Sequence, residues 1–262
     1  MLAQAMSVQG LIARTAADLQ LSMPAVIAAD PRDPFHVPLL WRGASLDEPI
    51  RVALALDDFG FGLHPAVATA LDKAAGALSD AGYAVEKAEP PRVREAAETG
   101  YRALLSEVKA LMDADIRRYG SETVKSIFDE YYRQFPPFDG AEALQMMAQR
   151  TLYARGWSGF LERYPLVLTP FLLKPFFSAW RDTEGAEGVH EVLGQAHWSY
   201  LINFIGLPAG NLPSHIAELP AGPQPIGVQI VGRRWREDLI VDAMQAIEGR
   251  IPPACTSLWD RM

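Results

Sequence analysis

The chain offers few side chains in arrangements that could carry out nucleophilic chemistry. Acyl transfer needs a serine, threonine or cysteine beside a general base, with hydrogen-bond donors aimed at the developing oxyanion. Ser158 does not lie in a Gly-x-Ser-x-Gly elbow, and Ser7 has no partner residues upstream of it. We therefore interpret both serines as polar residues of a turn or helix, and we assign no catalytic residue within the chain.

The histidines and the cysteine do not predict a metal site. His190 and His197 are seven residues apart on one predicted helix, which places them on a similar face but two turns apart. Paired metal ligands on a helix usually stand four residues apart. Cys255 is the only cysteine, so neither an internal disulfide nor a multi-cysteine zinc site can form. We expect no metal and no organic cofactor.

A loop from Asp57 to Gly62 follows a predicted strand and opens a predicted helix, where phosphate groups often bind. Gly60 and Gly62 match only part of a dinucleotide fingerprint, because Pro65 occupies the third glycine position. Asp57 and its acidic neighbour would also repel a phosphate. A tight turn explains these glycines, and a nucleotide-binding α/β protein is an alternative hypothesis.

This loop belongs to a predicted strand, helix and strand unit. Residues 50–56 alternate apolar and small side chains, which indicates a strand, and residues 83–88 are typical of a second strand. Between them an apolar stripe predicts a helix that begins at Pro65 and ends at Gly82. Such a crossover places two parallel strands in one sheet.

The remaining chain is predicted to be mostly helical, with short strands near its end. Thr15 and Asp18 have the spacing of a capping box, and Pro24 is expected to kink the helix or to displace its start. The further predictions are an irregular connector at 35–49, a mainly helical layer at 92–163, a strand at 166–169, one helix at 189–204, a turn region at 206–210, a strand at 226–231 and a helix at 237–248. We find no internal repeat and treat residues 1–262 as part of a single domain.

Composition excludes several classes of protein. The formal net charge of -8 argues against a nucleic-acid-binding protein, which needs a positive face. We interpret the cluster of Arg233, Arg234 and Arg236 as a solvated helix entrance. The apolar stretch at 165–180 contains Lys174 and is shorter than the roughly 20 residues of a membrane-spanning helix. The single cysteine and the lack of a secretory signal indicate a cytoplasmic protein.

Apolar residues follow the predicted strand at 166–169 and are typical of a pocket wall. Thr169 and Pro170 end the strand, and bulky side chains, among them Phe171 and Phe176, follow them. Small-molecule pockets are generally lined by apolar side chains with few polar groups. We predict that Thr169, Pro170, Phe171 and Phe176 line a substrate pocket, with ordinary core packing as the alternative.

Three segments together resemble the amidase signature family. They are residues 7–18, with Gly10, Arg14, Thr15 and Asp18 matching the family pattern, the strand end at 164–170, and residues 203–248. Leu11 stands where that family usually has proline. The resemblance implies an α/β fold with a mixed sheet flanked by helices, which this chain would form incompletely.

The resemblance also implies an activity, and the segment that performs it is missing. Members of the family cleave carboxylic amides through an acyl-enzyme, using a lysine and two serines in a glycine-rich Ser-Ser segment, without metal or organic cofactor. This chain contains neither a Ser-Ser nor a Gly-Gly pair. We therefore expect it to be the C-terminal portion of an amide hydrolase, truncated before Met1 and inactive alone.

Partners follow from the same resemblance. The complete enzyme would bind a small-molecule amide, and an uncovered sheet edge would favour an upstream polypeptide or self-association. No nucleic acid or membrane partner is expected. Besides the nucleotide-binding protein, the alternative is a non-catalytic binding or assembly module derived from this fold.

Overall fold

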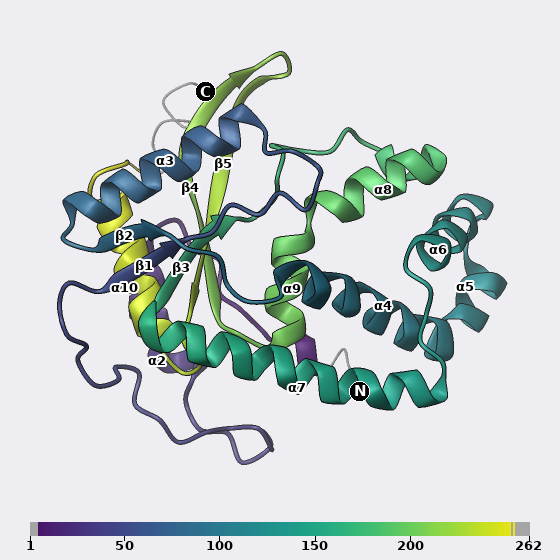
Figure 1. Cartoon of the computed structure of the whole chain (residues 1–262), viewed down its shortest axis with the longest axis horizontal. Helices are drawn as coiled ribbons and strands as arrows, with labels where there is room; N and C mark the ends of the chain where they lie inside the picture. The colour runs from purple at the N-terminus through teal and green to yellow at the C-terminus, as the bar shows by residue number, and fades with distance from the viewer. Residues whose placement is uncertain (1–4, 253, 255–262) are drawn as a thin grey trace.

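A five-stranded mixed sheet lies between two helical layers in the computed structural model, which describes residues 5–252 and Ala254 (Figure 1). The strand order is β2-β1-β3-β5-β4, and the strands are β1 (Arg51–Leu54), β2 (Ala84–Lys87), β3 (Leu166–Pro170), β4 (Ala209–Leu219) and β5 (Gly222–Gly232). The helices are α2 (Ala16–Val26), α3 (Pro65–Asp80), α4 (Val93–Leu111), α5 (Asp113–Tyr119), α6 (Glu122–Gln134), α7 (Gly140–Arg163), α8 (Gly185–Gln195), α9 (His197–Ile205) and α10 (Glu237–Glu248). Cys255 lies outside the described residues. The predicted α/β class is confirmed.

The predicted crossover is present in the structure. β1 pairs in parallel with β2, and α3 is the connection between these two strands. β1 also pairs in parallel with β3. Pro65 is the first residue of α3, where its missing N–H costs no hydrogen bond. The His64 Nδ1 atom caps this helix by accepting from the Ala66 N–H (3.1 Å). Local sequence signals therefore fix this unit.

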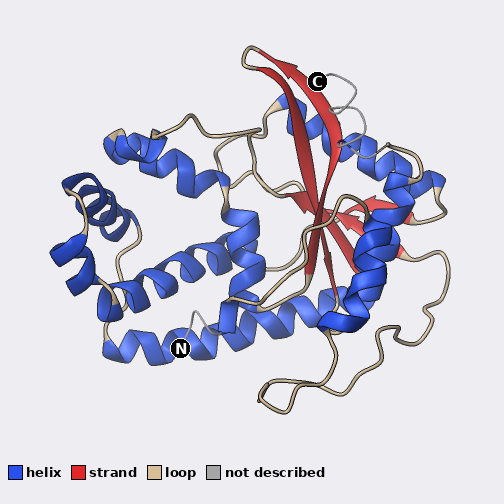
Figure 2. Cartoon of the chain, turned by 180° about the vertical axis from the view of Figure 1, so that it is seen from behind, coloured by secondary structure: helices blue, strands red, loops and turns tan. Residues whose placement is uncertain are grey.

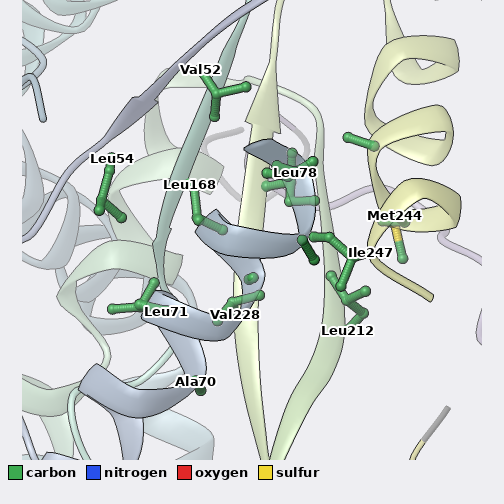
Figure 3. Close-up of a cluster of buried hydrophobic side chains, with 14 of the residues drawn as sticks. Val52, Leu54, Ala70, Leu71, Leu78, Leu168, Leu212, Val228, Met244 and Ile247 are labelled. Carbon is green, nitrogen blue, oxygen red and sulfur yellow. The ribbon is translucent and has the colours of Figure 1, made fainter. Parts of the chain in front are cut away.

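Each face of the sheet packs on its own hydrophobic core. On one face, α3 and α10 cover β4 and β5, and Figure 3 shows Leu78, Val228 and Met244 among the side chains of this core. On the other face, α4, α7 and α9 pack together around residues such as Trp157 and Trp198. Figure 2 shows these helices from the reverse side. Full burial of one such side chain contributes about 1.5–3 kcal/mol relative to leaving it exposed, so both cores stabilise the sheet.

The N-terminal segment follows the sequence predictions in part. The Thr15 hydroxyl caps α2 by accepting from the Asp18 N–H (3.2 Å). Pro24 lies inside α2, and the helix continues past it to Val26 instead of starting later. No helix or strand occurs between residues 27 and 50, which agrees with the predicted connector at 35–49. Residues 92–163 are mainly helical, as predicted.

One prediction near the end of the chain was wrong, and another was right only in part. The single helix predicted at 189–204 is two helices, α8 and α9, which separate at Ala196. The predicted turn region at 206–210 holds for residues 206–208, where Gly206 ends α9 with a left-handed φ of 71°, but Ala209 and Gly210 already begin β4. β4 itself, which pairs antiparallel with β5, was not predicted, and its Pro213 lies at a register shift on an edge strand, where proline is tolerated.

The arginine cluster lies at the entrance of α10, as predicted, but two of its side chains bind the ends of other helices. The Arg233 guanidinium donates to the carbonyls of Leu161 (2.7 Å) and Glu162 (2.9 Å), near the end of α7. Arg234 donates to the carbonyl of Ile205 at the end of α9 (2.7 Å). The last carbonyls of a helix lack partners within it, and a cation there also interacts favourably with the helix dipole. These arginines therefore hold two helix ends against the end of β5.

We expect the Arg233→Met substitution to lower the free energy of unfolding by about 1–3 kcal/mol, because it leaves the partly buried Leu161 carbonyl and the exposed Glu162 carbonyl without their charged donor. Urea unfolding followed by circular dichroism measures this change. Arg32→Met is the matched control, since that side chain is exposed and pairs only with Asp30. A loss no larger than that of the control would contradict the proposed role of Arg233.

Candidate functional site

The predicted pocket residues lie at the carboxyl end of β3. Thr169 and Pro170 are the last residues of this strand and both are buried. Phe171 and Phe176 follow the strand and are 37% and 57% exposed. Because β1 and β3 are parallel, the loop after β1 opens at the same edge of the sheet. In open α/β sheets ligands bind outside the carboxyl ends of strands, so this edge is the candidate site.

Two hydrogen bonds fix the segment that follows β3. The Leu173 carbonyl accepts from the His64 N–H (2.9 Å), just before α3, and the Leu173 N–H donates to the Gln195 carbonyl at the end of α8 (3.2 Å). Leu173 itself is buried. Phe171 and Phe176 are thereby presented on either side of one anchored residue.

A row of polar side chains crosses the sheet at Thr169. Val167 packs with the core of α7 and α9, so Thr169, two residues further along the strand, points to the same face. Gln229 of β5 stands opposite Thr169, and Asn211 of β4 stands opposite Gln229. The Gln229 amide donates to the Thr169 hydroxyl (3.1 Å), which donates to the Pro170 carbonyl (2.9 Å). Thr169 and Gln229 are buried, whereas Asn211 is exposed.

An aromatic cluster adjoins this edge, and sequence reasoning did not identify it. His197, at the start of α9, stacks on Phe59 with 4.8 Å between ring centroids. The rings of Phe61, Tyr101 and Phe135 also lie within 6.3 Å of the His197 ring. The Trp198 indole donates to the Asp57 carbonyl (2.9 Å), which ties α9 to the loop after β1. The closely spaced Phe59 and Phe61 were the available signal, but their partners come from distant segments.

The environment of His197 disfavours its charged form. Its Nδ1 atom lies 2.7 Å from the Gly194 carbonyl, and because a carbonyl can only accept, Nδ1 carries the proton. Burial lowers the pKa of His197, since desolvation disfavours the imidazolium. His190 is on a different helix, so the predicted placement of both histidines on one helix face was wrong. The two rings are instead linked through Phe61, whose ring centroid is 4.8 Å from that of His190.

The loop after β1 engages its own acidic side chains. Phe59 has a left-handed φ of 53°, uncommon for a residue other than glycine. Its N–H donates to the Asp57 carboxylate (2.7 Å), and the Gly60 N–H donates to Asp58 (2.8 Å). Arg94 pairs with Asp57 (2.7 Å). These amides already have anionic acceptors, which argues against phosphate binding at this loop.

Two hollows on the described surface do not include the predicted pocket residues. One, of about 340 Å³, is lined by residues around Arg92 and Tyr153. Another, of about 310 Å³, lies between α4 and α7 and includes Glu95, Glu98 and Arg102. Neither of these two hollows is lined by Thr169, Pro170, Phe171 or Phe176.

No catalytic pair is assembled among residues 5–252. No hydrogen bond there joins a serine to a lysine or a histidine, and Ser214, for example, donates to the carbonyl of Ala70 (2.8 Å). The described part of the chain also holds no group of three metal-ligating side chains. None of the described helices is long and apolar enough to cross a membrane.

The fold is that of the amidase-signature hydrolases. Fatty acid amide hydrolase superposes with a TM-score of 0.71 at 18% identity, over 92% of this chain and 47% of that one. The 6-aminohexanoate cyclic dimer hydrolase superposes with a TM-score of 0.69 at 23% identity, over 92% of this chain and 54% of that one. These likenesses define the class by its architecture.

The sequence comparison identifies the family. A sequence model of the amidase family matches residues 1–241, and the chain belongs to that family. Indoleacetamide hydrolase of Bradyrhizobium diazoefficiens is 35% identical over 100% of this chain and 49% of its own length. The enzyme of the same name from Bradyrhizobium japonicum is 34% identical over 100% of this chain and 56% of its length. The chain thus spans about half the length of these relatives.

The buried His197 predicts a pH-dependent stability. Its pKa in the folded state is lowered from 6.5, so the unfolded state binds more protons at acidic pH. We expect this contribution to be present above about pH 6.5 and to be lost as the pH falls through the folded-state pKa. Thermal unfolding is measured from pH 8 to pH 5. The melting temperature should fall less towards acidic pH for His197→Gln than for the parent chain. His36→Gln, in the connector, is the control and should retain the parent slope.

The polar row predicts coupling between Thr169 and Gln229. We expect Thr169→Val to lower the free energy of unfolding by about 1–3 kcal/mol, because the buried Gln229 amide loses its acceptor. Gln229→Met added to Thr169→Val should cost less than the sum of the single changes, by about 0.5–3 kcal/mol. Urea unfolding of the four proteins measures the coupling. Thr69→Val, on the exposed side of α3, is the control, and strict additivity would contradict the interaction.

Proposed function

We propose that this chain is the C-terminal portion of a carboxylic amide hydrolase and forms the acyl-binding side of its active site. The observation that carries the proposal is the identity of 35% to an indoleacetamide hydrolase over the whole chain, together with a buried polar strand end bordered by aromatic residues. Thr169 and Pro170 form the base of the pocket wall. Phe171 and Phe176 extend it into the open.

The composition of this edge favours an aryl or other apolar acyl group. Phe59, Phe171 and Phe176 are only partly buried and lie on the loops that follow the parallel strands. Aromatic rings pack well against other rings in offset or edge-on geometry. The names of the two Bradyrhizobium relatives specify an aryl acetamide, indoleacetamide. We extend that substrate class to this chain as part of the proposal.

The chemical step needs groups that these residues do not assemble. An amide hydrolase of this type uses a serine hydroxyl to attack the amide carbonyl carbon, releases ammonia or an amine, and hydrolyses the acyl ester with water. The hydroxyls of Ser79, Ser106 and Ser199 donate to main-chain carbonyls, and that of Ser121 accepts from the Val124 N–H. We therefore assign the nucleophile and its lysine to residues outside this sequence.

The purified 262-residue chain should release no ammonia from indole-3-acetamide above the buffer rate, because it lacks an activated nucleophile. An intact indoleacetamide hydrolase from Bradyrhizobium japonicum serves as the positive control under the same conditions. Ser7→Ala and Ser158→Ala variants complete the set. Turnover that co-purifies with the chain and disappears in either variant would contradict the assignment of the nucleophile.

A further inference from the structure

Two polar side chains at the junction of α8 and α9 are buried and each carry an acceptor atom without a partner. Gln195 is 1% exposed, and its Oε1 atom forms no hydrogen bond with the described residues. His197 is 8% exposed; its Nδ1 atom bonds to the Gly194 carbonyl, whereas its Nε2 atom has no hydrogen-bond partner among the described residues. Buried polar atoms are normally paired, because an unpaired one costs about 1–3 kcal/mol. The junction therefore offers acceptors to a donor that these residues do not supply.

The tautomer of His197 fixes what kind of group can bind there. A carbonyl oxygen only accepts, so the proton between Nδ1 and the Gly194 carbonyl (2.7 Å) resides on Nδ1. In the neutral imidazole, Nε2 then carries a lone pair and accepts a hydrogen bond. Desolvation by burial lowers the pKa of His197, which favours this neutral form. The complementary group on a ligand is therefore an N–H or O–H donor.

Aromatic rings surround this acceptor, and none of them supplies the donor. Phe59 stacks on the His197 ring, with 4.8 Å between centroids and an interplanar angle of 28°, and three further rings lie within 6.3 Å. The Tyr101 hydroxyl is the only hydrogen-bonding group on these rings, and it donates to the Leu193 carbonyl (2.6 Å). An acceptor framed by aromatic rings suits a planar aryl ligand that carries one donor.

A glycine makes this arrangement possible. A Cβ atom added to Gly194 would lie 2.1 Å from the Phe61 ring, so any larger residue would displace that ring from its place beside His197. The carbonyl of the same glycine binds Nδ1 of His197. The position of the ring and the tautomer of the imidazole therefore depend on one residue.

The acceptor adjoins the candidate site. The Gln195 carbonyl accepts from the Leu173 N–H (3.2 Å), in the segment that follows β3. The Trp198 indole donates to the Asp57 carbonyl (2.9 Å), in the loop that follows β1. Residues on both sides of His197 in the sequence are thus held to the two loops that form the carboxyl edge of the parallel strands.

We propose that His197 determines specificity for the acyl group of the amide by accepting a hydrogen bond at Nε2 from a ring N–H or hydroxyl, an inference that rests on the proposed function. The substrate class is then narrower than aryl amides in general, because the ring system itself carries a donor. The surrounding rings pack on the aryl group, and the hydrogen bond fixes its orientation. Such a site discriminates against an analogue that lacks the donor, because the acceptor is left unpaired.

Two amides of nearly the same shape test the role of the donor. Indole-3-acetamide carries a ring N–H, and benzofuran-3-acetamide has an oxygen atom in its place. Isothermal titration calorimetry measures the binding of each amide to the 262-residue chain. We expect indole-3-acetamide to bind roughly tenfold more tightly, or better. Histidine 15N NMR of the parent chain gives a readout that needs no variant, since the His197 Nε2 resonance should shift far more with indole-3-acetamide than with benzofuran-3-acetamide.

The variant His197→Phe keeps an aromatic ring in the cluster and removes the acceptor. It should bind the two amides equally and retain the parent affinity for benzofuran-3-acetamide, which also shows that the variant is folded. His190→Phe is the matched control, because His190 contacts the same Phe61 ring but is exposed. This control should keep the preference of the parent chain.

The outcomes separate this inference from the proposed function. Equal binding of the two aryl amides to the parent chain would overturn the role of His197 and leave the proposed function in place. A preference for indole-3-acetamide that persists in His197→Phe would overturn that role in the same way. Hexanamide is the third probe, and binding of hexanamide but of neither aryl amide would overturn the aryl substrate class together with this inference. Binding of none of the three amides would count against the proposed function as well.

Discussion

The pairing of β3 with two strands of opposite direction is the constraint on which the rest of the molecule depends. All five residues of β3 are buried, and the strand runs parallel to β1 and antiparallel to β5. It thereby joins three segments that are more than 50 residues apart in sequence. Because β1 and β3 point the same way, their loops open at one edge, where Phe59 and Phe171 lie. The candidate site is a direct consequence of this pairing.

Burial on both faces also fixes the register of β3. Leu166 and Leu168 face the core under α3, while Val167 and Thr169 face the core of α7 and α9. A slip of one residue would send Thr169 into the first core without Gln229 and would place Leu168 opposite that amide. The buried polar pair therefore selects one register at a point where apolar residues alone would tolerate several.

Most helices and strands could be predicted because local sequence signals specify them. Features that depend on contacts between distant segments could not be predicted. The crossover, the Thr15 cap and α10 depend on residues close together in the chain. β4 was missed because its sequence contains Gly210 and Pro213, whereas its pairing with β5 depends on tertiary contacts. The break at Ala196 has no proline or glycine at that residue to reveal it. The ring contacts of His197 arise only when four segments meet, and no spacing in the sequence records them.

The positions of the two cores show which part of the described sheet the helices leave uncovered. Both faces of β3 and β5 are already covered by helices, so a further segment would contribute little to the centre of the domain. The outer side of β4 has no such cover, and its face bears Asn211, the exposed end of the row that starts at Thr169. The row therefore runs from the carboxyl end of β3, where the candidate site lies, to an exposed side chain on an edge strand of the described sheet.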